Sequence, residues 1–180
     1  MGAVSERKQR FEQRVLPHLG AAYNLARWLT RNDHDAQDVV QEAVLRAYRF
    51  FEGLRGEPRP WLLAIVRNSC WTWLQVNRPA ELAGFDDHAL EPRAAEEPGP
   101  EALAMRQFDR RLLNEALAAL PAQFREALIL RELEDLSYKD ISRITDAPLS
   151  TVMSRLARGR RLLAESLRAV SNASAARVHK

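Results

Sequence analysis

A row of side chains suited to nucleic-acid contact stands near the C-terminal end of the sequence. At about 100° per residue, a helix over 150–167 places hydroxyl and guanidinium groups on one side. These residues are Thr151, Ser154, Arg155, Arg158 and Arg161. Base edges and phosphates accept hydrogen bonds from such groups. The opposite side would pack on a preceding helix through Val152, Leu156, Gly159 and Leu163. A solvated, Arg-rich amphipathic helix would show the same pattern, so the neighbouring elements are needed to distinguish it from a DNA-binding helix.

The neighbouring elements favour a DNA-binding role for this helix. The pattern predicts a short helix over 138–144, a turn over 145–148, and a longer helix with Ser150 as its N-cap. Pro148 forbids one continuous helix through this point. Two helices joined by a tight turn are typical of a helix-turn-helix. Residues 141–180 also carry eight Lys or Arg against two Asp or Glu, a local charge of +6.

A second candidate surface lies on a helix predicted over 35–49, with Asp33 or Asp35 as its N-cap. One arc of this helix carries Asp38, Gln41, Glu42, Leu45 and Arg49. The opposite arc is an apolar stripe of Ala36, Val39, Val40, Ala43, Val44 and Ala47. An exposed leucine among carboxylates fits a protein-docking surface, but a solvated helix face with one stray leucine fits as well.

A third candidate surface lies on a helix that begins at Pro60 or Trp61 and reaches about Val76. Its buried stripe is predicted to be Leu62, Ile65, Val66, Ser69, Trp73 and Val76. Its other side carries Arg67, Asn68, Trp71, Gln75 and Arg78. A basic, amide-bearing face with an aromatic ring suits unstacked bases and backbone phosphates. Trp71 could equally be an ordinary core or interface aromatic.

Composition narrows the class of protein. The chain has 180 residues, of which 46% are hydrophobic, so it is long enough for one medium or two small domains. A single cysteine, Cys70, excludes a disulfide scaffold. No apolar run is long enough for a membrane span, and residues 1–10 lack the apolar core of a secretory signal. We therefore expect a soluble protein in a reducing, intracellular compartment.

The charge distribution divides the chain. Residues 1–78 carry +4, residues 79–101 carry −6, residues 102–140 carry −1 and residues 141–180 carry +6, which gives the net +3. The acidic stretch holds four prolines between 79 and 100 and is predicted to be a flexible, extended linker. Of the 27 basic residues, 24 are Arg, which suits bidentate phosphate and guanine contacts but also follows from a GC-rich genome.

The expected organisation is all-α, with two small helical domains. A flexible N-terminus (1–10) precedes a first domain over 11–78, in which Phe11, Val15, Leu19, Ala22 and Leu25 recur at helical spacing. After the linker (79–100), a second domain over 101–167 is predicted to hold helices at 101–119, 121–134, 138–144 and 150–167. Pro121 is expected at the first helical position of its helix. The tail (168–180) is expected to fray.

These residues closely resemble a known family. The run Leu120-Pro121, Arg125-Glu126, Tyr138, Ile141, Ile144, Pro148, Thr151-Val152, Ser154-Arg155-Leu156 and Arg158 resembles region 4 of bacterial sigma factors. Residues 35–42 and 45–48 resemble the region 2 segment that docks on core RNA polymerase. Trp61-Leu62-Leu63, Ile65 and Arg67-Asn68 resemble the promoter-opening helix of the family. The chain is most similar to the small two-domain, extracytoplasmic-function (ECF) group.

The resemblance implies a promoter-specificity subunit that is not an enzyme and needs no cofactor or metal. Its first domain would bind the β′ clamp helices of core RNA polymerase through the Asp38–Arg49 arc, and its second domain would meet the β flap. A −35 element would be read by Thr151, Ser154, Arg155, Arg158 and Arg161. A −10 element would be read and melted by Arg55, Arg59, Arg67, Asn68 and Trp71, with capture of a flipped base. The family also implies a cytoplasmic location, a stress response and an anti-sigma partner.

The chain departs from the family pattern at several positions. Ser142 stands where an alanine is common, Asp146 where the turn has a glycine, and Met153 where a basic residue is frequent. Asp tolerates left-handed backbone geometry better than most residues. The promoter helix ends with a single Arg over 71–78 rather than a basic run. We therefore expect the isolated chain to bind DNA poorly and to need the polymerase.

Several alternatives stay open on the sequence alone. A helix-turn-helix regulator that works without polymerase would tolerate charge reversal in the Asp38–Arg49 arc. A sigma-like decoy would titrate an anti-sigma factor without binding DNA. An enzyme is disfavoured because the four His residues are scattered without ligand or triad spacing, and Asp35 and Asp38 fit helix capping better than metal binding. The acidic linker could mimic RNA in the polymerase cleft or serve only as a solubilising tether.

Overall fold

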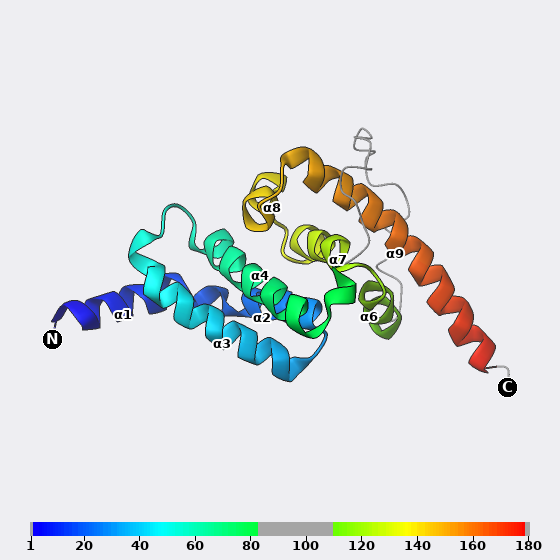
Figure 1. Ribbon diagram of the computed structural model, residues 1–180, viewed down its shortest axis with the longest axis horizontal. Helices are drawn as coiled ribbons and strands as arrows, with labels where there is room; N and C mark the ends of the chain where they lie inside the picture. The colour runs from blue at the N-terminus through cyan, green and yellow to red at the C-terminus, as the bar shows by residue number, and fades with distance from the viewer. Residues whose placement is uncertain (1, 83–109, 179–180) are drawn as a thin grey trace.

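The computed structural model describes residues 2–82 and 110–178, and every regular element in these ranges is helical (Figure 1). The helices form two blocks, one on each side of the undescribed stretch. The all-α, two-block organisation predicted from the sequence is therefore confirmed for these ranges. Most of the predicted linker, residues 83–100, and the first part of the predicted helix over 101–119 lie outside them.

The first block is built from α1 (Gly2–Arg14), α2 (Leu19–Thr30), α3 (Asp33–Phe50) and α4 (Pro58–Asn77). The apolar repeat between Phe11 and Leu25 spans two helices, because a 3-10 turn over Leu16–His18 separates α1 from α2. Pro17 lies in this turn and lacks the N–H that a continuing helix needs. Helices α2, α3 and α4 pack against one another around a core that includes Leu25, Leu29 and Leu62.

Helix α1 begins at Gly2, inside the segment expected to be a flexible N-terminus. Arg7 Nη2 donates to the Tyr48 carbonyl at 2.6 Å, near the C-terminal end of α3, where helical carbonyls lack partners of their own. The Phe11 ring meets the rings of Tyr48 and Phe51 edge-on, at centroid distances of 5.1 and 5.3 Å. These contacts hold α1 on the first block.

The start of α3 corrects one expectation. The N-cap is Asn32, whose side chain accepts from the Asp35 N–H at 3.0 Å, rather than Asp33 or Asp35. Both aspartates lie in the first turn, where a negative charge is favoured by the helix dipole. In the predicted apolar stripe of α3, Ala36, Val39, Ala43 and Ala47 are buried, while Val40 and Val44 are half-buried.

Helix α4 differs from the prediction in its start and in its buried side. It begins at Pro58, two or three residues before the predicted start at Pro60 or Trp61. Leu62, Val66 and Ser69 are buried as predicted, but Val76 is 77% exposed, and Ile65 and Trp73 are only partly buried. Three further residues are buried that the predicted stripe left out: Leu63, Cys70 and Leu74. Helix α4 is therefore covered on more than one side.

The second block contains α6 (Arg110–Ala118), α7 (Ala122–Leu128), α8 (Tyr138–Thr145) and α9 (Leu149–Val178), with a π-helical turn over Ile129–Leu133 after α7. Pro121 is the N-cap of α7 rather than its first helical residue. The prediction that α9 runs over 150–167 with Ser150 as its N-cap is wrong at both ends. The helix begins at Leu149 and continues to Val178, well into the segment expected to fray.

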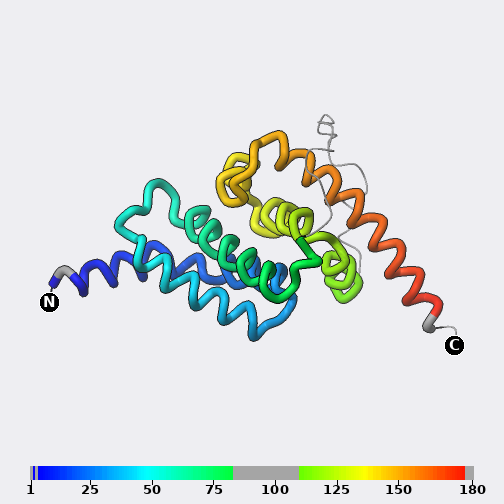
Figure 2. The backbone as a smooth tube through the Cα atoms, viewed as in Figure 1, coloured from blue at the N-terminus to red at the C-terminus, as the bar shows by residue number. Residues whose placement is uncertain are grey.

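The two blocks lie side by side. Helix α8 packs against α4, and α7 packs against α2, so both α2 and α4 contact the second block. Helix α1 and the far end of α9 project at opposite ends of an elongated molecule, as Figure 2 shows. Among the described helices, none combines the length and the apolar character that crossing a membrane requires.

Candidate nucleic-acid interface and docking surface

The turn between α8 and α9 is held by local hydrogen bonds. Ser137 caps α8 by accepting from the Asp140 N–H at 3.1 Å. At the other end, Asp146 adopts the left-handed conformation (φ 51°, ψ 42°) and donates its N–H to the Ser142 carbonyl. Ser142 Oγ donates to the Ala147 carbonyl at 2.6 Å, which gives this serine a bracing role in the turn. The helix-turn-helix predicted from the sequence is thus formed.

Helix α9 has the two sides expected of it. Val152, Leu156 and Leu163 are buried, and a Cβ on Gly159 would lie 3.3 Å from the Leu128 side chain of α7. On the other side, Arg161 is exposed, and the rest of the row is partly buried: Thr151, Ser154, Arg155 and Arg158. Arg158 is drawn back toward α7, with its guanidinium carbon 5.7 Å from the centroid of the Phe124 ring.

Two of the predicted −10 residues face the second block. Arg67 Nε donates to Glu126 Oε1 of α7 at 2.6 Å, and Trp71 Nε1 donates to the same oxygen at 2.9 Å. The Arg67 guanidinium also lies 4.3 Å from the centroid of the Trp71 ring, within cation–π range. In this structure Trp71 is an interface aromatic, which was the alternative left open by the sequence.

The other three predicted −10 residues are divided between the interface and the surface. Arg59, in the first turn of α4, donates to Glu134 Oε2 at 2.7 Å and to the Glu134 carbonyl at 2.8 Å. Arg55, in the loop before α4, and Asn68, on α4, are exposed. All five residues thus lie on α4 or the loop leading into it, and three of them contact the second block.

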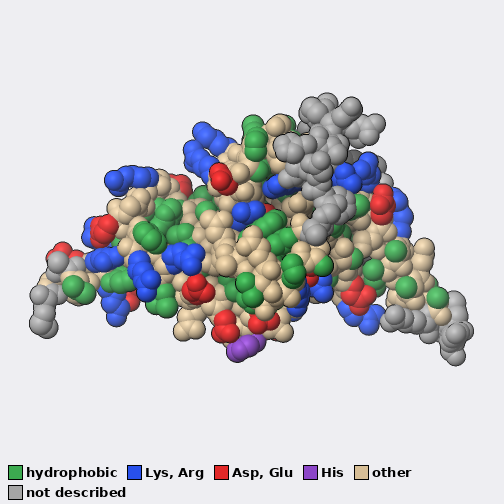
Figure 3. All heavy atoms as spheres, in the orientation of Figure 1, with side chains coloured by type: hydrophobic (Ala, Val, Ile, Leu, Met, Phe, Trp, Pro, Cys, Tyr) green, Lys and Arg blue, Asp and Glu red, His purple; other side chains and the backbone are tan. Residues whose placement is uncertain are grey.

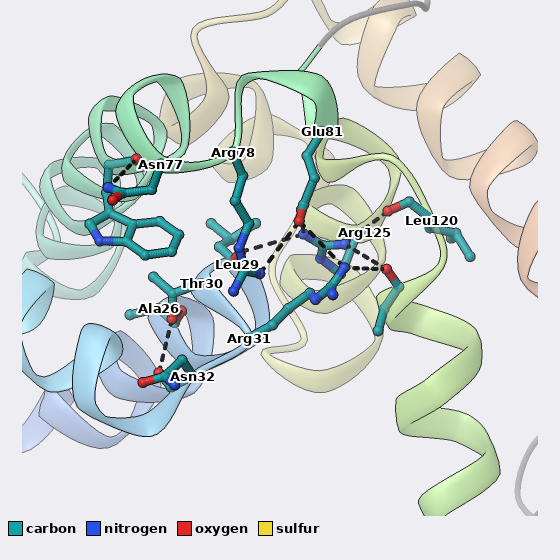
Figure 4. Close-up of polar contacts among 12 residues, drawn as sticks. Ala26, Leu29, Thr30, Arg31, Asn32, Asn77, Arg78, Glu81, Leu120 and Arg125 are labelled. Carbon is teal, nitrogen blue, oxygen red and sulfur yellow. Dashed lines mark hydrogen bonds and ion pairs between the residues drawn. The ribbon is translucent and has the colours of Figure 1, made fainter.

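A buried arginine joins the two blocks at a further point. Arg125 of α7 is fully buried, and its Nη2 lies 2.8 Å from Glu81 Oε2 and 3.4 Å from the Leu29 carbonyl of α2. Its Nη1 donates to the Leu120 carbonyl at 2.8 Å. Burial lowers the pKa of Arg125, and the bond to Glu81 opposes that shift. Figure 4 shows the Glu81 carboxylate between the guanidinium groups of Arg78 and Arg125.

The predicted docking arc on α3 is open to solvent. All five of its members are exposed: Asp38, Gln41, Glu42, Leu45 and Arg49. Leu45 is 60% exposed, and Phe50, which the sequence analysis did not single out, is 63% exposed. Glu42 forms an ion pair with Arg46 at 3.1 Å. The face is therefore an exposed apolar and charged surface, and the ion pairs of Asp38 and Glu42 lie within α3 itself.

On the face seen in Figure 3, charged side chains are dispersed. In the view of Figure 3, the Lys and Arg side chains are interspersed with apolar and acidic ones rather than gathered in one patch.

Near the start of α3, Arg27 and Tyr23 both donate to the Asp33 carboxylate, and these bonds hold the pKa of Asp33 below its usual value.

Sequence reasoning missed the carboxylates that make these contacts. Glu126 and Glu134 are both buried, and Glu81 is the first acid of the predicted linker. The available signal was the Arg125-Glu126 pair, which stands in a stretch otherwise rich in apolar residues, where charges are rarely left unpaired. Their partners lie about 45 to 75 positions away in the chain, so the pairing itself could not be predicted from local spacing.

Comparisons with known proteins agree with this geometry. The sigma-70 region 2 profile matches residues 15–78, and the sigma-70 region 4 profile matches residues 110–163. The chain is 35% identical over 177 residues to the ECF RNA polymerase sigma-E factor of Haemophilus influenzae, covering 89% of this chain and 92% of that protein. It is 35% identical over 179 residues to the RNA polymerase sigma-H factor of Pseudomonas aeruginosa, covering 90% and 91%.

A solved structure is similar as well. It is the sigma factor RpoE in complex with the anti-sigma factor NepR, from Bartonella quintana. The TM-score is 0.68 at 25% sequence identity, and the match covers 89% of this chain and 98% of that one. The similarity therefore extends across both helical blocks.

Proposed function

This chain belongs to the ECF group of bacterial RNA polymerase sigma factors, and from that premise we propose how its surfaces divide the work of promoter recognition. As a sigma factor it binds core RNA polymerase and promoter DNA and directs transcription initiation at specific promoters, and it is not an enzyme. It acts with the polymerase and the chromosome in the cytoplasm. We take residues 11–78 as its region 2 domain, 79–100 as the linker and 101–167 as its region 4 domain.

We assign −35 recognition to α9. The residues in this role are Thr151, Ser154, Arg155, Arg158 and Arg161. Support comes from the formed helix-turn-helix, whose second helix keeps its apolar side on α7 and so leaves the other side for a major groove. Guanidinium groups suit bidentate contacts to guanine and to phosphates.

We assign −10 opening to α4 and the loop before it. The residues in this role are Arg55, Arg59, Arg67, Asn68 and Trp71. Arg and Trp side chains suit stacking and phosphate contacts with a single strand, and a captured flipped base would offset part of the unstacking cost of a few kcal/mol. Binding to the single strand would then drive melting without ATP.

We assign core-polymerase docking to the exposed α3 face, to which we add Phe50 beside Leu45. This surface is the observation that carries the proposal, because a DNA-binding regulator that works without polymerase has no need of it. An exposed aromatic and an exposed leucine rimmed by charges are typical of a protein interface. We further propose that an anti-sigma factor controls the chain, as NepR binds the similar RpoE.

Run-off transcription tests the assignment of roles. Purified core polymerase is given a template that carries the promoter region of the operon encoding this chain, with and without the protein. We expect a specific transcript only with the protein. The double charge reversal Asp38→Arg/Glu42→Arg should abolish the transcript, whereas Glu12→Arg, an exposed acid on α1, should leave it intact.

Two results would contradict the proposal. A transcript that survives the double reversal would remove the docking role of α3. No transcript with the unmodified chain, from the promoter of its own operon, would overturn promoter recognition as a whole.

A further inference from the structure

Arg7 of α1 binds the end of α3, where the chain turns toward α4. Its Nη2 donates to the Tyr48 carbonyl at 2.6 Å and to the Arg49 carbonyl at 3.2 Å. Carbonyls at this end of a helix lack partners within the helix, and a positive charge there is favoured by the helix dipole. Arg7 Nε also lies 3.7 Å from a carboxylate oxygen of Glu52, the second residue beyond α3. Arg7 thus joins α1 to the start of the segment that leads into α4.

Two further arginines of α1 contact this segment, residues 51–57, which we call the −10 loop because the proposed function assigns it to the −10 element. Arg10 Nη2 donates to Glu52 Oε1 at 3.1 Å, and Arg14 Nη2 donates to the Gly56 carbonyl at 3.4 Å. In every one of these contacts the two residues stand 41 or 42 positions apart in the chain. Because this offset is nearly constant, α1 runs alongside the loop and contacts it at successive points.

Apolar packing fixes α1 against the −10 loop. The Phe11 ring of α1 meets the Phe51 ring edge-on, with the centroids 5.3 Å apart, and both side chains are buried. At about 100° per residue, Phe11 falls on the same side of α1 as the three arginines. The side of α1 that faces the loop therefore carries a buried ring flanked by guanidinium groups.

The sequence of the −10 loop by itself permits many backbone conformations. Two of its seven residues are glycines, Gly53 and Gly56, and glycine loses more conformational freedom on folding than any other residue. Gly56 has a φ of 76°, and Arg14 donates to the carbonyl of this same residue. Leu54 is buried, whereas Arg55 beside it is exposed. The contacts from α1 thus restrict the backbone that carries Arg55.

We propose that the three arginines of α1 are positioning residues for −10 recognition, which hold the −10 loop in the conformation in which Arg55 meets the strand. The proposal rests on the assignment of this loop to the −10 element. A loop that is ordered before the strand arrives loses little conformational freedom on binding, so more of the interaction energy remains to offset base unstacking. Loss of the α1 contacts should slow promoter opening and leave polymerase docking through α3 and −35 binding through α9 intact.

Glu52 distinguishes positioning from direct contact between the arginines and DNA. If the arginines bound phosphates, removal of a neighbouring negative charge would leave promoter opening unchanged or improve it. If Arg10 acts through the loop, Glu52→Gln impairs opening as Arg10→Gln does, because each change removes the same ion pair.

Permanganate reactivity of unpaired thymines measures opening by the holoenzyme, which is assembled from core polymerase and the full-length chain. The template carries the promoter region of the operon encoding this chain. We expect Arg10→Gln and Glu52→Gln each to slow opening about threefold, the effect of losing one exposed ion pair. Lys8→Gln removes the same charge from α1, but the partner of Lys8 is Glu12 of α1 itself, so this matched control should open at the unmodified rate.

The double variant Arg10→Gln/Glu52→Gln completes the opening assay. Because both changes remove one interaction, the double variant should open about as fast as either single variant. Losses that add in the double variant would show that the two side chains act separately and would overturn the proposal. Opening by Glu52→Gln at the unmodified rate or faster would overturn it as well.

Hydrogen exchange read by mass spectrometry reports the order of the −10 loop in the full-length chain without DNA or polymerase. We expect peptides that span 51–57 to exchange about threefold faster in Arg10→Gln/Arg14→Gln than in the unmodified chain, and Lys8→Gln to match the unmodified chain. Unchanged exchange in the double variant would show that the arginines do not hold the loop. Faster exchange throughout α2 and α3 would show a general loss of stability and would equally contradict a positioning role.

Arg55→Ala in the opening assay separates this proposal from the proposed function. If Arg55→Ala slows opening while the Arg10 and Glu52 variants do not, only the positioning role of α1 is refuted. If Arg55→Ala leaves opening unchanged, the assignment of the loop to the −10 element is refuted, and the positioning role falls with it.

Discussion

Asp146 has the most costly backbone conformation in the helix-turn-helix. Its φ of 51° is costly for residues with a side chain, by about 1–2 kcal/mol for most of them. We predict that Asp146→Gly raises the free energy of unfolding by about 0.5–1 kcal/mol, because glycine adopts this conformation freely. Urea unfolding followed by circular dichroism measures the change. Ala157→Gly, at an exposed helical position in α9, should lower stability by about 1 kcal/mol, and the same sign for both variants would contradict the argument.

Replacing Leu45 distinguishes an effect on polymerase docking from an effect on the stability of the fold. Because it is 60% exposed, Leu45→Ala should change the free energy of unfolding by less than about 0.5 kcal/mol. The same change should weaken binding to core RNA polymerase by about tenfold, as expected for an apolar anchor at an interface centre. Val4→Ala on α1, where Val4 is 72% exposed, is the matched control. Biolayer interferometry on immobilised core polymerase gives the affinities, and equal values for both variants would count against docking through α3.

Helix α4 shows what a sequence pattern can and cannot predict. Its residues that face α2 and α3 follow the period of their own domain, so Leu62, Val66 and Ser69 were predicted correctly. Leu63, Cys70 and Leu74 break that pattern because α8, more than 60 positions further along the chain, packs against α4. Local periodicity carries no information about such a contact.

Helix ends and single-residue caps were also harder to predict than whole helices. Helix α9 continues past Leu167 because residues 168–178 contain no proline or glycine to end it, although they have little to bury. Asn32 is the N-cap of α3, although two nearby aspartates were equally suited by residue type. The helix-turn-helix, by contrast, followed from Pro148 and two amphipathic stripes, which are strong local signals.

The contact between α7 and α9 depends on the small size of Gly159. A Cβ there would lie 3.3 Å from Leu128 Cγ and 3.4 Å from the Phe124 carbonyl oxygen, so a large side chain has to push the two helices apart. We predict that Gly159→Leu lowers the free energy of unfolding by about 1–3 kcal/mol through overpacking. Ala157→Leu, two positions away on the exposed side of α9, should change it by less than about 0.5 kcal/mol. A thermal unfolding scan distinguishes the two, and equal losses would mean that the helices are free to move apart.

At the scale of the whole molecule, polar contacts across the boundary accompany an apolar core that continues through both domains. Three carboxylates mark the boundary, and each meets an arginine from the other side of it: Glu126 with Arg67, Glu134 with Arg59, and Glu81 with Arg125. Such pairs demand one geometry, because a misaligned charge left without its partner is expensive when buried. The three pairs therefore fix the register in which the two domains pack.

Arg125 couples the two domains most directly, since it binds Glu81, at the start of the linker, and the Leu29 carbonyl of α2. We predict that Arg125→Met lowers the free energy of unfolding by about 3 kcal/mol, because Glu81 and the carbonyls lose their buried donor. Arg78→Gln also removes a partner of Glu81, but Arg78 is 31% exposed, and its loss should cost less than about 1 kcal/mol. Hydrogen exchange read by mass spectrometry should show faster exchange in both α2 and α7 of Arg125→Met. Faster exchange in α7 alone would mean that this arginine stabilises region 4 without joining it to region 2.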